Sequence, residues 1–199
     1  MITGCLLRDA FISAAVTIAN KKREVDELNV YPVPDGDTGT NMSMTMSAAV
    51  AELKRLDDNV SAAEVTSVTA SALLRGARGN SGVILSLLFR GFAKGLSNST
   101  NAECDTIANA LELGVDAAYK AVMKPAEGTI LTVSKAAAIK AQEIAKSTND
   151  TTVLWQEVCN EADRVLQKTP DMLPVLKKAG VVDAGGQGFV IIMGGSDSK

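Results

Sequence analysis

Apolar residues recur at helical spacing along almost the whole 199-residue chain, and this pattern constrains the fold more than any other feature. Hydrophobic residues make up 46% of the sequence, while aromatic residues make up only 4%. This composition suits close-packed helices better than a β-sandwich, which usually takes more aromatic and β-branched residues. We therefore predict an all-α bundle of about eight helices, formed as a single domain over residues 1–195 with a flexible tail at 196–199.

Apolar spacing, capping signals and helix breakers define the expected helices. Ser61 and Glu64 have the spacing of a capping box, and so do Thr100 and Glu103. The segment 82–96 is apolar nearly all round, which predicts a buried central helix. The predicted helices cover residues 5–22, 41–56, 61–74, 82–96, 100–122, 130–146, 152–168 and 171–179, the last one ended by Gly180.

Two further expectations concern the core and the end of the chain. Met42, Met44 and Met46 follow helical spacing, and we expect them to fill gaps in the core rather than bind a ligand. The last apolar run, 189–193, fits either one more helical turn or a short strand.

Charge and cysteine content limit the partners and the cellular compartment. The net charge of −3 gives no general attraction to nucleic acid, and no apolar run approaches the roughly 20 residues that span a bilayer. The N-terminal residues lack the basic-then-apolar order of a signal peptide. Because the three cysteines are odd in number and widely spaced, we expect reduced thiols in a cytoplasmic protein without nucleic-acid binding or membrane insertion.

The chain contains no histidine. This excludes Ser–His and Cys–His nucleophiles, histidine-ligated metals and a histidine general base. Any chemistry must therefore rest on carboxylates, hydroxyls, backbone amides, Lys, Arg and a metal ion.

The segment 29–41 contains two carboxylates, Asp35 and Asp37, between prolines and glycines. Carboxylates that point into one pocket repel each other unless a cation lies between them, and hard oxygen ligands favour Mg²⁺ or Ca²⁺. The alternative interpretation is a solvated Asx-type turn. The residues that follow add hydroxyl, amide and backbone N–H donors of the kind that hold phosphate oxygens: Thr38, Gly39, Thr40 and Asn41.

Three more glycine-rich segments each have two interpretations. Residues 76–82 form either an anion cradle at a helix N-terminus or an N-cap with glycines for close helix crossing. Residues 127–131 form a helix entry, explained by capping through Thr129 or by ligand contact. Residues 183–188 form either a C-terminal turn or a ligand loop. Because loops that converge at one end of a bundle can share a ligand, the four segments together predict a site for Mg²⁺ and ATP or ADP.

These four segments, in this order, resemble the kinase domain found in the larger, nucleotide-binding component of bacterial fatty acid kinase, which is related to the nucleotide-binding L subunit of dihydroxyacetone kinase. The strings that carry the resemblance lie at residues 25–41, 76–86, 127–133 and 182–188. The resemblance covers essentially the whole chain and implies an antiparallel eight-helix barrel with the nucleotide at one end.

The resemblance also implies roles for individual residues. Asp35 and Asp37 would bind Mg²⁺, with two ions expected, and Asn29 stands near the place of a third aspartate in the dihydroxyacetone relatives. Arg78 would add positive charge, although it also fits a solvated surface arginine. The phosphates would be held by Thr38, Gly39, Thr40, Asn41, Gly79, Asn80, Ser81 and Gly82, and the adenosine would be flanked by Gly128, Thr129, Ile130, Asp183, Gly185 and Gly186.

Two positions depart from the relatives: Thr38 stands where they carry histidine, and Leu87 stands where a glutamine is expected. A fatty acid fits a chain without histidine, because its carboxylate is already ionised near neutral pH and needs no base. We therefore expect ATP- and Mg²⁺-dependent phosphoryl transfer to a fatty acid held by a separate acyl-binding partner, the B subunit of fatty acid kinase.

Two alternatives remain: a kinase of dihydroxyacetone or a similar small hydroxy-ketone, and a non-catalytic ADP-binding module. The fatty acid kinase component that this chain resembles is longer. A homodimer, if it forms, would use regions absent from this chain.

Overall fold

The computed structural model describes residues 1–194, and within them it contains ten helical segments and one isolated bridge between Ile2 and Ala102. Eight of the ten helices have nine or more residues, so the all-α prediction is confirmed. The predicted tail at 196–199 lies outside the described residues. The helices are α1 (Gly4–Glu27), α2 (Thr38–Ser47), α3 (Val50–Lys54), α4 (Ala62–Gly76), α5 (Gly79–Gly95), α6 (Cys104–Ala121), α7 (Ile130–Ala145), α8 (Thr151–Met172), α9 (Pro174–Ala179) and α10 (Ala184–Ile192).

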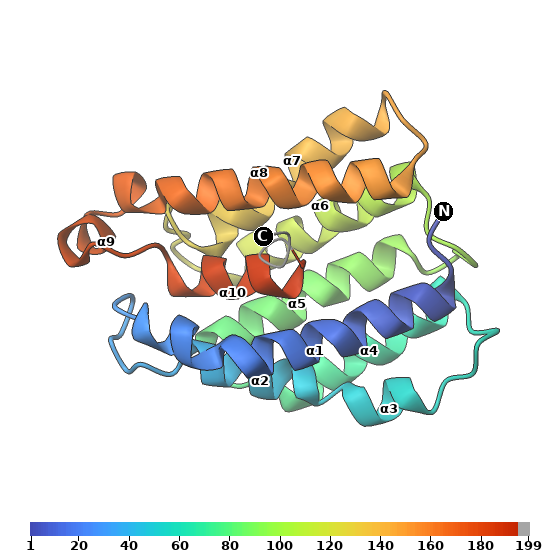
Figure 1. Ribbon diagram of the computed structural model, residues 1–199, viewed down its shortest axis with the longest axis horizontal. Helices are drawn as coiled ribbons and strands as arrows, with labels where there is room; N and C mark the ends of the chain where they lie inside the picture. Colours follow the sequence, from blue (N-terminus) through green and yellow to red (C-terminus); the bar gives the residue numbers. More distant parts are fainter. Residues whose placement is uncertain (195–199) are drawn as a thin grey trace.

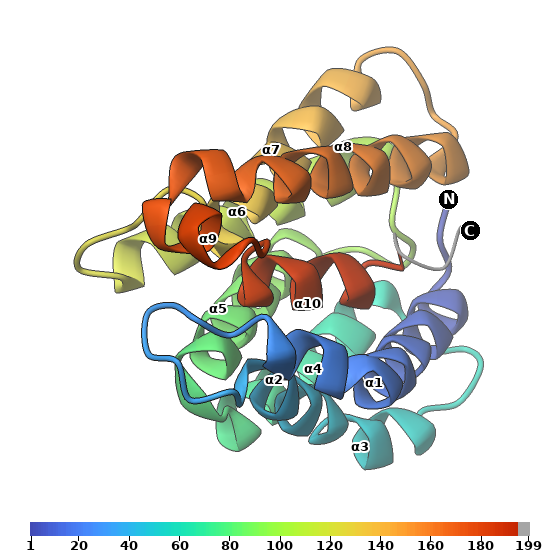
Figure 2. The ribbon, with the colours of Figure 1, turned by 60° about the vertical axis from the view of Figure 1, so that its left-hand side comes forward.

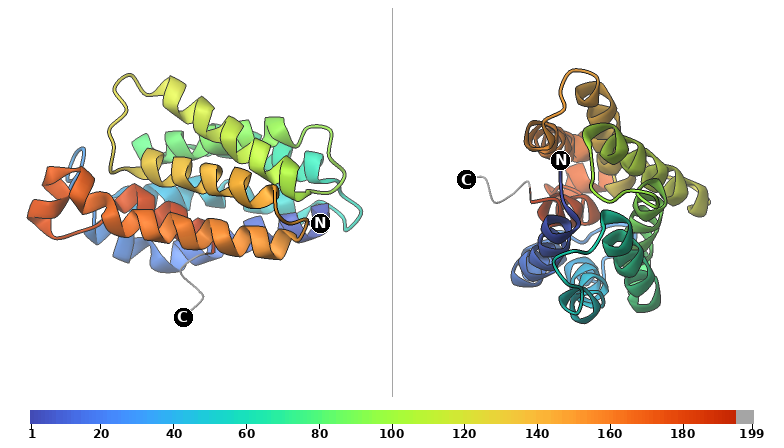
Figure 3. Two further views of the ribbon diagram at one scale, coloured as in Figure 1. Left: turned by 90° about the horizontal axis from the view of Figure 1, so that it is seen from above. Right: turned by 90° about the vertical axis from the view of Figure 1, so that its right-hand side faces the viewer.

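The long helices form an antiparallel ring around the core (Figures 1 and 3). Helices α4 to α8 each pack against the next, and α2 packs against both α1 and α5. Helix α10 closes the ring, because it contacts α1 and α2 on one side and α7 and α8 on the other. Figure 2 shows α10 between α8 above and α1 and α2 below.

The close approach of α10 to the rest of the bundle depends on glycine. A Cβ at Gly188 would overlap the Met42 sulfur and lie 2.9 Å from its methyl carbon. Met42 and Met46 are fully buried, as predicted, but Met44 is 48% exposed, so its assignment to the core was wrong. The free cysteines agree with the expectation of reduced thiols, and burial raises the pKa of the Cys159 thiol to about 11.

Several predicted helix boundaries hold. The Ser61 hydroxyl accepts a hydrogen bond from the Glu64 N–H at 3.0 Å and caps α4. Gly180 ends α9 in the left-handed conformation with φ of 71°, and the 189–193 run is helical as part of α10. Helix α7 matches its prediction to within one residue.

Other boundaries were wrong for local reasons. The predicted helix 41–56 begins earlier, at Thr38, and divides into α2 and α3 where the N–H groups of Ala48 and Ala49 bond three residues back. Thr100 does not open α6, because Ala102 is held in the bridge to Ile2 and the helix begins at Cys104.

Two more helix predictions need correction. Helix α8 continues to Met172, so only α9 remains of the helix predicted for 171–179. Helix α5 is buried along one side only, because Val83, Arg90 and Lys94 are exposed. No helix among residues 1–194 is both long and apolar enough to cross a membrane.

Candidate functional site

Helices α2, α5, α7 and α10 all begin at the same end of the molecule, the left end in Figure 1. Each begins at or within one of the four segments singled out in the sequence. The first turn of a helix carries N–H groups without partners in the helix and the positive end of its dipole. Four such ends on one side of the bundle favour an anionic ligand there.

The loop between α1 and α2 presents the two carboxylates to solvent. Asp35 and Asp37 are both exposed, and within residues 1–194 no hydrogen bond or ion pair involves either carboxylate. Asn29 is only 7% exposed and holds the loop from inside: its amide nitrogen donates to the Val33 carbonyl at 3.1 Å, and its amide oxygen accepts the Asp37 N–H at 3.1 Å. The side-chain amide of Asn29, predicted as a metal ligand, therefore bonds to the loop backbone.

These carboxylates fit a cation that is completed by a ligand. No group of three or more Asp, Glu or Cys side chains within the described residues lies close enough together to hold a metal ion by itself. Mg²⁺ usually keeps several waters and binds through one or two carboxylates together with substrate phosphates. Asp35 and Asp37, next to the N-terminus of α2, provide that donor set.

Asp26, which the sequence interpretation left without a role, fixes the start of α2. One of its carboxylate oxygens accepts the Thr40 N–H at 2.8 Å, and the other accepts the Thr40 hydroxyl at 2.7 Å. Gly39 brings the two helices into backbone contact, because a Cβ there would overlap the Lys22 carbonyl oxygen. Asp26 lies in the string just before the loop, and its fourteen-residue separation from Thr40 gave no local signal for this contact.

The first turn of α5 packs directly against α2. Gly79 has φ of 66°, and a Cβ there would lie 2.5 Å from the Asn41 amide nitrogen. The Thr45 hydroxyl donates to the Asn41 carbonyl at 2.7 Å and accepts the Arg78 N–H at 3.0 Å. The structure thus joins the first two predicted segments, and Thr45, a single threonine inside a helix, was not identified from the sequence.

The 76–82 segment combines both of its predicted interpretations. Gly76 ends α4 against the Ala48 side chain, and Gly82 lies in the first turn of α5 against the Thr45 side chain, so both permit close packing. Asn80 is exposed and Ser81 is half-buried at the start of α5, where their N–H groups face the open end. The Arg78 side chain is exposed and, within the described residues, forms no hydrogen bond or ion pair.

The third segment caps α7, as the capping interpretation predicted. The Thr129 hydroxyl accepts the Leu131 N–H at 3.3 Å and donates to the Ala126 carbonyl at 2.8 Å. Gly128 has φ of 87° and lies against the end of α8, where a Cβ would be 3.1 Å from the Thr169 carbonyl oxygen. Ile130 is buried at the first position of α7.

The fourth segment is the start of a helix, so the predicted C-terminal turn was wrong. Asp183 caps α10 by accepting the Gly186 N–H at 2.8 Å, and its own N–H donates to the Thr169 hydroxyl at 3.0 Å. Asp183, Gly185 and Gly186 are all buried. A Cβ at Gly185 would lie 3.4 Å from that of Ile130, so the third and fourth segments are in contact.

Burial raises the pKa of the Asp183 carboxyl from 3.8 to about 6, while the N–H groups of Gly186 and Ile130 oppose this shift. A raised folded-state pKa means that the folded protein binds the proton more tightly than the unfolded chain does. The contribution of this carboxyl to stability is therefore greatest at acid pH and is lost as the pH rises through about 6.

We expect Asp183→Asn, which keeps a capping oxygen but removes the charge, to remove this pH dependence. The free energy of unfolding of the native protein, minus that of Asp183→Asn, should fall by roughly 2 kcal/mol between about pH 4 and about pH 7. Urea unfolding of both proteins across this range measures the difference. A constant difference would contradict the raised pKa, and Asp150→Asn, an exposed helix cap, provides the control.

Comparisons with known proteins agree with this geometry. A family model described as the DAK2 domain matches residues 32–197. Protein YloV of Bacillus subtilis (strain 168) is 47% identical over 195 residues, which are 98% of this chain and 35% of that protein. An uncharacterized protein of Staphylococcus aureus (strain USA300) has the same identity and coverage. The chain thus spans about a third of the length of the curated relatives that it matches.

Solved structures share the fold. The dihydroxyacetone kinase from C. freundii in complex with AMP-PNP and Mg²⁺ has a TM-score of 0.71 at 19% identity, over 98% of this chain and 34% of that chain. The native form of the C. freundii enzyme has a TM-score of 0.67 at 14% identity, over 100% of this chain and 36% of that chain.

Proposed function

Because the chain belongs to the DAK2 domain family, we propose that it is a kinase domain that binds an adenine nucleotide with Mg²⁺. The observation that carries this proposal is the joint placement of four helix N-termini at one end of the bundle, beside two exposed carboxylates that have no protein partner within residues 1–194. The C. freundii kinase, which has the same fold, was crystallised with AMP-PNP and Mg²⁺. Such a ligand combines the phosphate and the cation that this end of the molecule favours.

The two halves of the site take different parts of the nucleotide in this proposal. Asp35 and Asp37 hold the Mg²⁺, which neutralises phosphate charge when bound. The N–H groups in the first turns of α2 and α5 bind the phosphates, with Asn80 and Ser81 beside them. Asn29 and Asp26 position these groups, because their side chains hold the loop and Thr40.

The second half of the site contributes the buried contact between α7 and α10. Thr129 and Asp183 fix the two helix starts, and Gly128, Gly185 and Gly186 leave room beside them. We assign the adenosine to this side. Arg78 lies exposed between α4 and α5, where it can add positive charge near the transferred phosphate.

We propose a fatty acid, held by a separate acyl-binding protein, as the acceptor. A carboxylate oxygen of the acid attacks the γ-phosphorus of ATP, the bond to the bridging oxygen of ADP breaks, and an acyl phosphate and ADP result. The attacking carboxylate is already ionised near neutral pH, so the reaction needs no general base, and the chain contains no histidine to supply one. Catalysis then consists of positioning and charge neutralisation.

A second candidate is phosphorylation of dihydroxyacetone or a similar small hydroxy-ketone. The observation that favours it is the shared fold with the C. freundii dihydroxyacetone kinase. A hydroxyl acceptor must lose a proton as it attacks, so this reaction would need a carboxylate as base.

The test is a phosphoryl-transfer assay with ATP and Mg²⁺ and three alternative acceptors: an acyl-loaded fatty-acid-binding protein, dihydroxyacetone, and buffer alone. Trapping with hydroxylamine reports acyl phosphate as a hydroxamate, and release of ADP is followed in parallel. We expect hydroxamate only with the acyl-loaded protein. Phosphorylated dihydroxyacetone would favour the second candidate, and bound ATP without transfer to either acceptor would identify a non-catalytic nucleotide-binding module.

A further inference from the structure

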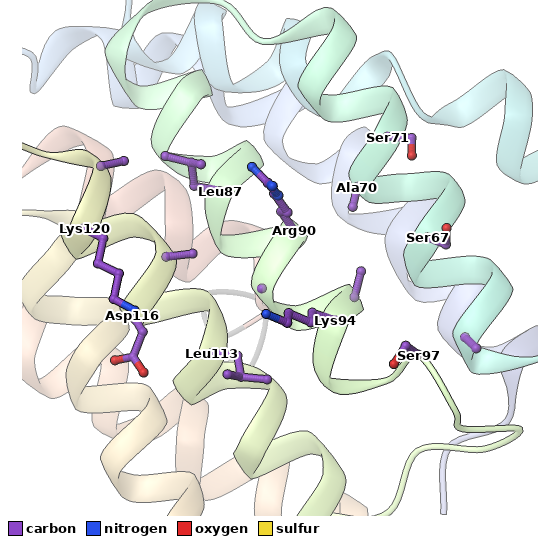
Figure 4. A pocket seen from close by; sticks show the side chains of 15 residues that line it. Ser67, Ala70, Ser71, Leu87, Arg90, Lys94, Ser97, Leu113, Asp116 and Lys120 are labelled. Carbon is purple, nitrogen blue, oxygen red and sulfur yellow. The ribbon is translucent and has the colours of Figure 1, made fainter.

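A hollow of about 820 Å³ lies on the outer flank of the bundle, where α4, α5 and α6 lie side by side (Figure 4). We call it the flank groove. Each helix contributes residues one turn apart, so the groove follows roughly two helical turns of α5, from Leu87 to Lys94. Its surface is formed largely by small side chains, among them Ala70, Ala93 and Ala117. Small side chains let another backbone approach closely.

The flank groove carries positive charge that the rest of the chain does not neutralise. Arg90 and Lys94 lie one turn apart on α5, and Lys120 lies on α6 (Figure 4). All three are exposed, and none forms an ion pair or side-chain hydrogen bond with another described residue. Asp116 is the only acid among the lining residues, although the whole chain has a net charge of −3. The local charge is therefore opposite in sign to that of the molecule.

The shape and lining narrow the kind of occupant. The lining contains no aromatic residue, which disfavours stacking of nucleic-acid bases. The cations line a hollow and not a protruding face, which disfavours a flat membrane surface. Small side chains on three helices, with cations spaced one turn apart, match a fourth helix that packs into the groove with acidic residues at the same spacing.

We propose that the flank groove is a docking site for an acidic amphipathic helix of a partner protein. Acidic residues four positions apart on that helix pair with Arg90 and Lys94, a further acid pairs with Lys120, and its small apolar residues face Ala93 and Ala117. Long-range attraction between the basic groove and the acidic helix speeds the encounter, while the apolar contact sets the register. The groove lies on the side of the bundle and leaves the four helix N-termini open, so this proposal does not depend on the kinase assignment.

The test measures binding of a fluorescent synthetic helix of about 14 residues, with alanine on one face and glutamates four residues apart, at about 0.05 M salt. A scrambled peptide of the same composition serves as its control. We expect the amphipathic peptide to bind about tenfold more tightly than the scrambled one. Lys94→Glu/Lys120→Glu should remove this preference, whereas Lys54→Glu/Lys146→Glu, which changes the net charge equally at exposed sites elsewhere, should keep it.

Two further variants separate docking from misfolding. Ser67→Trp fills the groove from the exposed side of α4 without a change in charge, and Arg90→Gln removes one cation; each should weaken the peptide by about tenfold or less. ADP binding, measured on the same samples, should be unchanged. Equal binding of the scrambled peptide, equal loss in the Lys54/Lys146 control, or self-association that only the groove variants abolish would overturn the proposal. So would binding to anionic vesicles in place of the peptide.

Discussion

Asp37→Asn is expected to reduce phosphoryl transfer by about a thousandfold and to remove most of the Mg²⁺-dependent part of nucleotide affinity. Asp37 has an exposed carboxylate at the entry to α2, and that carboxylate accepts no hydrogen bond from the described residues. Its backbone carbonyl accepts the Asn41 N–H at 2.8 Å, and asparagine can keep that bond. The substitution should therefore remove the metal ligand and leave the helix start intact.

Calorimetric titration of ADP, with Mg²⁺ and with a chelator, measures the effect on binding. Asp105→Asn is the matched control, because Asp105 is also an exposed carboxylate in or beside the first turn of a helix. It should bind nucleotide like the native protein. Native-like affinity and native-like dependence on Mg²⁺ in Asp37→Asn would rule out this carboxylate as a metal ligand.

Gly39→Ala is expected to destabilise the fold by about 2 kcal/mol or more, although alanine normally favours a helix. The added Cβ would overlap the Lys22 carbonyl oxygen and lie 2.8 Å from the Val25 Cβ, and both belong to a helix that cannot shift locally. The N-terminus of α2 must then move away from α1, which also disturbs the bond between Asp26 and Thr40. Urea unfolding gives the change in stability, and ADP titration gives the loss of affinity.

Gly185→Ala provides the comparison for stability. Its added Cβ would meet only Asp183 and Ile130 atoms at 3.4 Å or more, an ordinary van der Waals distance. We expect it to unfold within about 0.5 kcal/mol of the native protein. If Gly39→Ala were as stable as Gly185→Ala, the close contact between α1 and α2 would not exist as described.

Helical periodicity was sufficient for the class of the fold, because burial of one apolar face per helix is a local property of the sequence. The cap of α4 at Ser61 and the end of α9 at Gly180 were predicted for the same reason. The start of α6 was not, since it depends on the bridge between Ile2 and Ala102, which joins residues a hundred positions apart. The exposed side of α5 was missed because apolar composition does not tell which face another helix covers.

The sequence identified which segments form the candidate site, but not the contacts that hold them. Asp35 and Asp37 were recognisable because carboxylates beside glycines are a local pattern. Asp26 and Thr45 act through contacts to Thr40 and Arg78, and these pairings exist only once α1, α2 and α5 have packed. Asp183 was assigned to a loop, because the helix that it caps consists of glycines and a short apolar run.

Nuclear magnetic resonance of the labelled chain, titrated with ADP and Mg²⁺, tests most directly whether one ligand is shared by the four helix starts. The account predicts that the amide signals of residues 37–41, 79–82, 128–131 and 183–186 shift together, with the same affinity, while those lining the flank groove stay in place. Shifts confined to a single one of these segments, or found in the flank groove and not at the four helix starts, would contradict it.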